Sequence, residues 1–210
     1  MGICHVHLSE NQIWIEGIRV DSTFRKQKIA TSLVEYCEEI GRKNHALFSY
    51  MLIDTKNLAS INMAKSLSYE LYQTWNFYSL LPNFNSNYVV TFEKSLDFQK
   101  FSSFVKSWRW IPLNEKTSLS LCDENRIIQS DVDGDISTAI LTDSEHFDNT
   151  LIVTLFSGSS DSTFQILSFL QNYAMEKNYK RIQILSKEKI FNFDSLEYKI
   201  SFYLMKKFLD

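Results

Sequence analysis

Glycine is scarce in this 210-residue chain, with five residues or about 2%, where about 7% is usual in globular proteins. Proline is scarcer still, with two residues. Collagen-like repeats and flexible glycine-rich linkers are therefore excluded. Long apolar runs are also missing, because no uncharged stretch reaches the roughly 20 residues that a membrane helix needs. We therefore expect no membrane partner.

Cysteine and net charge are low as well. Cys4, Cys37 and Cys122 lie far apart and form no CxxC pair, so we expect no disulfide framework, no zinc knuckle and no metal. The net charge of −3 gives no electrostatic case for nucleic acid as a partner. The N-terminus lacks the basic and apolar regions of a secretory signal. These features predict a cytoplasmic protein with reduced thiols.

Core-forming residues are abundant instead. Hydrophobic residues make up 44% of the chain, which holds 16 phenylalanines, 10 tyrosines and 4 tryptophans. This composition supports a sizeable folded core and argues against a disordered chain. The length is typical of one or two domains.

The first half alternates between strand and helix patterns. Residues 3–8 and 13–20 predict two strands, and apolar residues at helical spacing predict a helix that begins near Ile29. The apolar run 46–53 predicts a buried strand. A short helix then ends at Leu67, and two further segments predict a closing pair of strands, 75–80 and 88–93. This alternation favours an α/β layer architecture.

The second half shows a similar order of elements. Apolar residues at helical spacing from Phe98 to Trp108 predict a helix. Residues 119–122 and 126–129 are expected to form a hairpin. Strands are then expected at 136–141, 151–156, 181–185 and 200–204, and a helix at 164–174. Both halves contain strand, polar loop, helix and strand in that order, and both loops contain Ser-Thr-Phe. We therefore expect a tandem of related domains, 1–96 and 97–210.

The loop that follows residues 13–20 carries most of the chemical information. Arg25, Lys26 and Lys28 put three positive charges in the turn before a helix. The first N–H groups of a helix have no internal partner and lie at the positive end of its dipole. This arrangement suits a phosphate or pyrophosphate. The alternative is a solvated basic loop.

This segment resembles the acetyl-CoA signature of the GNAT superfamily of N-acetyltransferases. That signature reads Arg or Gln, two residues, Gly, one residue, then Gly or Ala, and Arg25 and Ala30 hold its first and last positions. Downstream, Asn57-Leu58-Ala59-Ser60 and Leu67-Ser68-Tyr69 resemble the second motif of the family. The resemblance covers residues 3–93 by motif and the second half by element order. It implies a GNAT-like mixed sheet flanked by helices, in tandem with a second, degenerate GNAT-like domain.

The resemblance also implies a function. GNAT enzymes transfer an acetyl group from acetyl-CoA to a primary amine by direct attack, and the acceptor here would be a small molecule, amino acid or peptide. Backbone groups of Ile18 and Val20 would pair with the pantetheine arm, and Asn57 and Ser60 would lie beside the pantetheine and its thiol end. The backbone N–H groups of 25–31 would hold the pyrophosphate. The cofactor-binding residues implied are Ile18, Arg19, Val20, Arg25, Lys26, Gln27, Lys28, Ile29, Ala30, Thr31, Asn57 and Ser60.

The sequence departs from the family at the positions that carry chemistry. Lys26, Lys28 and Ser68 stand where the family has glycine, and Ala64 stands where many members have a tyrosine that protonates the leaving thiolate. An attacking ammonium must also lose a proton. Glu16, on the strand before the loop, is the candidate catalytic base, unless it only pairs with a neighbouring side chain. These departures motivate an alternative function as a catalytically weakened acyl-CoA-binding or interaction module.

Two further expectations concern the edges of the molecule. Family members usually begin with a strand and two helices before the strand expected at 3–8. Without them that strand has an exposed edge, which predicts a homodimer through it. In the second half, the loop 157–161 lacks cations and contains Asp161, which would repel phosphate. We expect that loop not to bind a nucleotide.

Overall fold

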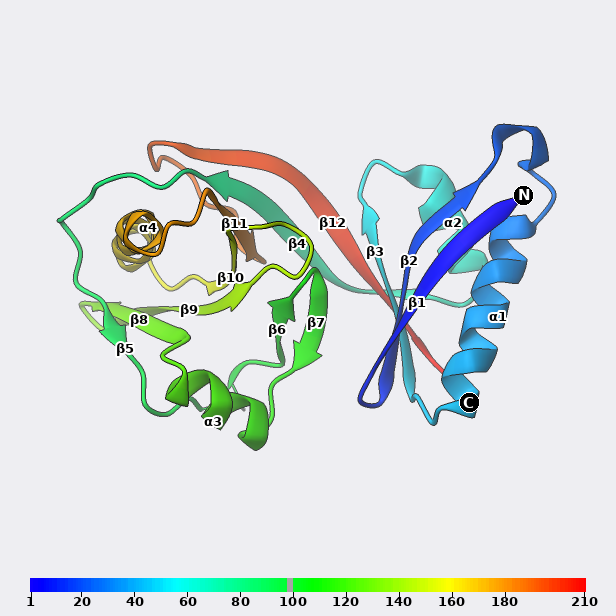
Figure 1. The fold of residues 1–210 in the computed structure, drawn as a ribbon, viewed down its shortest axis with the longest axis horizontal. Coiled ribbons are helices and arrows are strands. Elements are labelled where there is room, and N and C mark those ends of the chain that lie inside the picture. Colours follow the sequence, from blue (N-terminus) through cyan, green and yellow to red (C-terminus); the bar gives the residue numbers. More distant parts are fainter. Residues whose placement is uncertain (98–99) are drawn as a thin grey trace. The chain divides into compact units, whose positions relative to one another are not determined.

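A computed structural model describes residues 1–97 and 100–210 (Figure 1). Two compact units make up the chain, one formed by Met1–Thr74 with Ser201–Asp210 and the other by Trp75–Ile200. These units do not follow a single cut near residue 96, because the C-terminal strand returns to the first unit. The domain bounds 1–96 and 97–210 stay a prediction.

The N-terminal unit contains four neighbouring strands of a mixed sheet, in the order β1-β2-β3-β12. β1 pairs antiparallel with β2, β2 parallel with β3, and β3 antiparallel with β12. The strands and helices predicted over residues 3–67 are confirmed, within about two residues at most ends. The elements are β1 (Gly2–Ser9), β2 (Gln12–Val20), η1 (Ser22–Phe24), α1 (Ile29–Lys43), β3 (Phe48–Asp54), α2 (Leu58–Ser66), the start of β4 (Glu70–Leu80) and the end of β12 (Leu196–Phe208).

Both helices of this unit pack on one face of its sheet, as Figure 1 shows. Side chains alternate between the two faces of a strand, so one set of strand residues meets the helices. The core that results includes Ile13, Ile15, Val34, Cys37, Met51, Ile61, Ala64 and Met205. The opposite face therefore carries the intervening strand residues, Tyr50 and Lys206 among them.

The C-terminal unit contains further strands of a mixed sheet, in the order β4-β11-β10-β9-β8-β5, and a separate hairpin of β6 and β7. Helix α4 packs on this sheet through a core that includes Leu141, Leu151, Val153, Ile166 and Leu170. The elements are β5 (Thr91–Phe92), β6 (Ser103–Lys106), β7 (Arg109–Pro112), α3 (Glu115–Asp123), β8 (Ile127–Val132), β9 (Asp135–Asp143), β10 (Thr150–Phe156), α4 (Ser160–Glu176) and β11 (Arg181–Ser186).

The two units repeat one order of elements. β9 pairs antiparallel with β10, and α4 connects β10 to the parallel strand β11. β1, β2, α1 and β3 have the same order and the same directions of pairing. The predicted mixed α/β fold with a tandem repeat is therefore confirmed. The shared Ser-Thr-Phe string is not part of the repeat, because it forms η1 in one unit and lies inside α4 in the other.

The helix predicted from Phe98 to Trp108 is wrong. Phe98 lies outside the described residues, and 103–112 form the β6–β7 hairpin, with Ser107 and Trp108 at positive φ in its turn. Hydrogen bonds from distant strands hold this backbone extended: the Val105 N–H donates to Thr154 Oγ1 (2.7 Å), and Thr142 Oγ1 donates to the Val105 carbonyl (2.9 Å). These tertiary bonds override the helical spacing of the apolar residues.

The hairpin predicted at 119–122 and 126–129 is half wrong. The first segment lies in α3, which Asn114 and Thr117 begin with a reciprocal capping box, and the second is β8. The strands expected at 75–80 and 88–93 were predicted to pair with each other. This prediction is wrong, because β4 pairs with β11 and β5 pairs with β8. The strand expected at 88–93 is limited to Thr91–Phe92.

Ser68 provides a test of local backbone strain. Its φ of 66° lies in the left-handed region, directly after α2, where the GNAT motif has glycine. A side chain in this conformation costs about 1 kcal/mol. We therefore expect Ser68→Gly to raise the free energy of unfolding by about 1 kcal/mol in urea titrations. Ser66→Gly, at the last helical residue of α2, should instead lower it, by about 0.5 kcal/mol. Equal signs for the two variants would contradict this account.

Candidate functional site

A cavity of about 970 Å³ lies in the N-terminal unit, where β2 ends and α1 and α2 begin. It brings together ten of the twelve predicted cofactor-binding residues. Gln27 and Thr31 are not among its lining residues, although they lie in the same loop and in the first turn of α1. The lining residues are Gly17, Ile18, Arg19, Val20, Phe24, Arg25, Lys26, Lys28, Ile29, Ala30, Asn57, Ala59, Ser60 and Met63.

A β-bulge shapes the strand side of this cavity. The β1–β2 register shifts between the pairs Ile3–Arg19 and His5–Glu16, so β2 carries one extra residue there. Gly17 in this bulge has a φ of 64°, a conformation that favours glycine. β2 pairs with β3 only from Gln12 to Trp14. Beyond that point, within the described chain, the edge of β2 that faces away from β1 has no strand partner and can pair with an extended ligand.

The N-terminus of α1 forms the opposite side of the cavity. No side chain caps this end, and no acidic residue lies in the first turn. The N–H groups at the start of the helix therefore lack partners within it. Lys26 and Lys28 have φ values of 62° and 60°, so both lysines adopt the left-handed conformation that glycine favours. The backbone conformation expected of the two glycine positions thus forms here with lysine.

Arg25 ties this loop to the strand. Its Nε donates to the Val20 carbonyl over 3.3 Å, which holds the guanidinium at the cavity. At the start of the loop, Asp21 accepts hydrogen bonds from the backbone N–H and hydroxyl of Thr23, and these bonds lower the pKa of Asp21. Arg25, Lys26 and Lys28 all line the cavity, so its wall has an excess of positive charge.

The equivalent end of α4 differs in every one of these respects. Ser159 and Ser162 cap it reciprocally, and Asp161 lies in its first turn. Ser137 Oγ accepts from the Gly158 N–H (2.9 Å) and lies 2.8 Å from Ser162 Oγ. A Cβ on Gly158 would lie 2.5 Å from the carbonyl oxygen of Ile136. Ser159, Ser162 and the Gly158 N–H thus have partners in their own chain, whereas the buried Ser157 Oγ has none among the described residues. That this loop does not bind a nucleotide stays a prediction.

The start of α2 forms the third side of the cavity. Asn57 caps the helix, with its Oδ1 accepting from the Ser60 N–H over 3.1 Å. Met63 lies on the same helical face as Ser60, three residues on. Sequence reasoning missed Met63 and the half-exposed Phe24, which add apolar surface to the cavity. Helical spacing from Ser60 could have identified Met63, but Phe24 carried no such signal.

Glu16 pairs with a histidine across the hairpin. Its Oε1 lies 3.1 Å from His5 Nδ1, and both side chains are partly exposed. Glu16 is not among the residues that line the cavity, whereas the next residue, Gly17, is. The pairing alternative is thus observed, and a catalytic role for Glu16 stays a prediction.

Neither of the two nearby tyrosines, Tyr69 and Tyr72, lines the cavity. Ala64 is fully buried in the core. Tyr69 is also buried, its hydroxyl lies 2.5 Å from Ser49 Oγ, and burial raises its pKa. Tyr72 is not part of the cavity wall. Among the described lining residues, Ser60 carries the only side-chain hydroxyl.

The bulged strand, the basic loop and the start of the uncapped helix all lie within a segment that matches a known protein family. Residues 1–69 match the acetyltransferase (GNAT) family. This GNAT segment runs from β1 to the end of α2 and contains every residue that lines the cavity. No curated protein matches the sequence.

Solved GNAT structures share the fold of the whole chain. A GCN5-related N-acetyltransferase from Sphaerobacter thermophilus aligns over 98% of this chain and 76% of its own, with a TM-score of 0.61 and 11% identity. A Thermoplasma acidophilum protein provisionally assigned as an acetyltransferase aligns over 99% and 74%, with a TM-score of 0.61 and 12% identity. A tandem GNAT protein from the clavulanic acid biosynthesis pathway aligns over 100% and 79%, with a TM-score of 0.52 and 9% identity. At these identities the likeness shows the fold alone.

Residues 1–97 and 100–210 offer neither a metal site nor a membrane-spanning helix. No group of three or more His, Cys, Asp or Glu side chains there could hold a metal ion. None of the helices there has both the length and the apolar character needed to cross a bilayer.

Proposed function

We propose that the chain is an N-acetyltransferase, which moves an acetyl group from acetyl-CoA to a primary amine of a small molecule, amino acid or peptide. One observation carries the proposal: the uncapped N-terminus of α1 and the unpaired edge of β2 line one cavity, together with Arg25, Lys26 and Lys28. Backbone N–H groups at a helix N-terminus bind phosphate, and an unpaired strand edge binds an extended amide chain.

The residues present fit the parts of acetyl-CoA. The N–H groups of Ile29, Ala30 and Thr31 and the three cations would hold the pyrophosphate, with Arg19 and Gln27 beside them. The β2 edge at Ile18 and Val20 would pair with the pantetheine, and Asn57 and Ser60 would lie along its other side. Acetyl-CoA supplies the acyl group in activated form, as a thioester.

The chain would then manage the proton of the acceptor. Glu16 and its partner His5 lie next to Gly17 of the cavity wall and would together serve as the proton acceptor. From that position the pair would take the ammonium proton through water, which leaves a nucleophilic amine. A backbone N–H near Val20 would donate to the carbonyl oxygen as negative charge develops on it. Because the methyl side chain of Ala64 cannot donate a proton, the proton for the departing sulfur would come from solvent.

Turnover is tested by thiol release from acetyl-CoA with a panel of primary amines. We expect one class of amine to be acetylated, and we expect Glu16→Gln to lower kcat about 10²-fold, a usual magnitude for loss of a general base. Glu35→Gln, an exposed site on α1, is the matched control and should leave kcat unchanged. A Glu16→Gln enzyme with full kcat would show that Glu16 only pairs with His5.

A second candidate function is an acyl-CoA-binding module without turnover. The observation that favours it is Ala64, which is fully buried where many GNAT enzymes present a tyrosine. Calorimetry with acetyl-CoA separates the two candidates from a purely structural role. Micromolar binding without thiol release for any amine in the panel would select the binding module.

The predicted homodimer and cytoplasmic location belong to the same proposal. β1 is the outermost strand of its sheet, and its outer edge has no strand partner in the described part of the chain. Such an edge can pair with a second copy. Both the dimer and the location stay predictions.

A further inference from the structure

Two cysteines from neighbouring elements meet inside the N-terminal unit. Cys4 lies on β1 and Cys37 on α1, which pack against each other (Figure 1). Both are free thiols, and their Sγ atoms are 3.7 Å apart. The Cys37 thiol donates to the Cys4 sulfur, and the Cys4 thiol donates to the Glu16 carbonyl oxygen over 3.9 Å. A disulfide bond is about 2.05 Å long, so the two sulfurs need to approach by about 1.7 Å from their separation of 3.7 Å.

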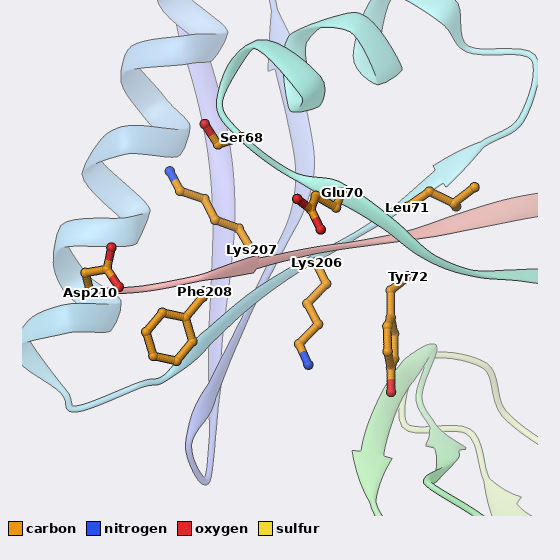
Figure 2. Close-up of a pocket in the computed structure, with 8 residues that line it drawn as sticks. All are labelled: Ser68, Glu70, Leu71, Tyr72, Lys206, Lys207, Phe208 and Asp210. Carbon is orange, nitrogen blue, oxygen red and sulfur yellow. The ribbon is translucent and has the colours of Figure 1, made fainter.

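The packing of α1 holds the helix side of this pair in place. Cys37 is 4% exposed and belongs to the core of the unit, together with Ile13 and Val34. Its neighbour Glu38 pairs with Lys207 over 2.7 Å, and Figure 2 shows the Lys207 side chain extending from β12 toward α1. The sheet thus fixes the helix that presents Cys37 to β1, and little further freedom is lost when the two sulfurs bond.

The strand side of the pair is open to small reagents. Cys4 is partly exposed, and β1 is the outermost strand of its sheet, with no strand partner at its outer edge among the residues that the structure describes. Cys4 also lies opposite the β-bulge of β2, between the register pairs Ile3–Arg19 and His5–Glu16. A bulge locally disrupts the ladder of hydrogen bonds. The backbone at Cys4 is therefore less tightly held than in a regular pair of strands.

We propose that Cys4 and Cys37 form a dithiol site that small-molecule disulfides oxidise to an intramolecular disulfide. The Cys4 thiolate attacks one sulfur of the oxidant, so that a mixed disulfide forms and one thiol leaves. The Cys37 thiolate then attacks the Cys4 sulfur, so that the Cys4–Cys37 bond forms and the second thiol leaves. The protein loses two electrons and two protons, and the oxidant is reduced to two thiols.

The disulfide ties β1 to α1 and leaves the cofactor cavity outside the link, because neither cysteine lines that cavity. The proposal therefore goes beyond acetyl transfer and does not depend on it. Burial slows the first step, since desolvation raises the pKa of Cys4 to about 12 and also raises the pKa of Cys37. Thiolate is the attacking species, so the exchange runs faster in mild alkali than at neutral pH.

The test treats the folded full chain with oxidised glutathione at about pH 8.5 until the products stop changing. Intact-mass and peptide mass spectrometry identify the products. We expect a monomer that has lost two hydrogen atoms, with the Cys4–Cys37 linked peptide about tenfold more abundant than the Cys4 glutathione adduct. Cys122, a buried thiol on α3, is the internal control and should stay free. A glutathione adduct as the main product, a link between two chains or unreacted Cys4 would each overturn the proposal.

A second measurement shows whether the folded unit accommodates the bond. We expect oxidation to raise the urea midpoint of the unchanged protein, because a cross-link between residues 33 positions apart restricts the unfolded chain. Cys4→Ser removes the partly exposed thiol and should show neither the link nor the rise. Cys122→Ser keeps the pair and should respond to oxidation as the unchanged protein does. A midpoint that falls on oxidation would show that the sulfurs bond only when the fold is distorted, and the proposal would then be wrong.

Discussion

Arg25→Glu is expected to weaken the binding of acetyl-CoA about a hundredfold, or about 2.7 kcal/mol. Arg25 is held at the cavity by its Nε bond to the Val20 carbonyl, and it lies beside the uncapped N-terminus of α1. A charge-assisted contact to phosphate contributes about 1.5–3 kcal/mol. The substitution removes that contact and adds a negative charge where the pyrophosphate would lie. Isothermal titration of both proteins with acetyl-CoA measures the difference.

Lys43→Glu is the matched control for this experiment. It makes the same change in net charge at the opposite end of the same helix, on an exposed residue. Screening limits its effect on a ligand at the N-terminus, because about 20 Å of helix separates the two ends. We expect its affinity for acetyl-CoA to stay within about twofold of the unchanged protein. Equal losses in Arg25→Glu and Lys43→Glu would indicate a general charge effect and would remove the support for a built phosphate site.

Local patterns were sufficient to predict most of the N-terminal unit and its cavity. The strand, the basic loop and the helix that begins at Ile29 are contiguous, and each has its own periodicity or charge signal. Eight of the predicted residues that line the cavity belong to this segment, whereas Asn57 and Ser60 lie at the start of α2 and were implied only by the resemblance to the second GNAT motif. The positive φ values of Lys26 and Lys28 had no such signal, because lysine seldom adopts them. Those values follow from the turn that joins β2 to α1.

Long-range contacts account for what the sequence did not predict. The β6–β7 hairpin is held by Thr142 and Thr154, which lie about 40–50 residues further along the chain. Similarly, Lys206 on β12 meets the rings of Phe48 and Tyr50 on β3 because these two strands pair, although they are about 150 residues apart in the chain. The helical spacing near Phe104 predicted a helix where a strand forms, because periodicity depends only on residues that are close in the sequence.

Glu38 links α1 to the C-terminal strand β12, and its removal should strongly destabilise the N-terminal unit. Its Oε2 lies 2.7 Å from Lys207 Nζ and 3.6 Å from Arg42 Nη2. The side chains of Glu38 and Lys207 are only 3% and 18% exposed. Loss of one partner leaves a largely buried charge, so we expect Glu38→Ala to lower the free energy of unfolding by about 3 kcal/mol in urea titrations.

Two companion variants show whether the loss comes from the ion pair. Glu39→Ala changes an exposed neighbour on α1 and should alter the free energy of unfolding by less than about 0.5 kcal/mol. Glu38→Ala combined with Lys207→Met removes both charges and should recover most of the stability, because an apolar pair carries no desolvation penalty. If the double variant is no more stable than Glu38→Ala alone, the lost stability comes from packing around α1. The link to β12 would then rest on the apolar contacts of Met205.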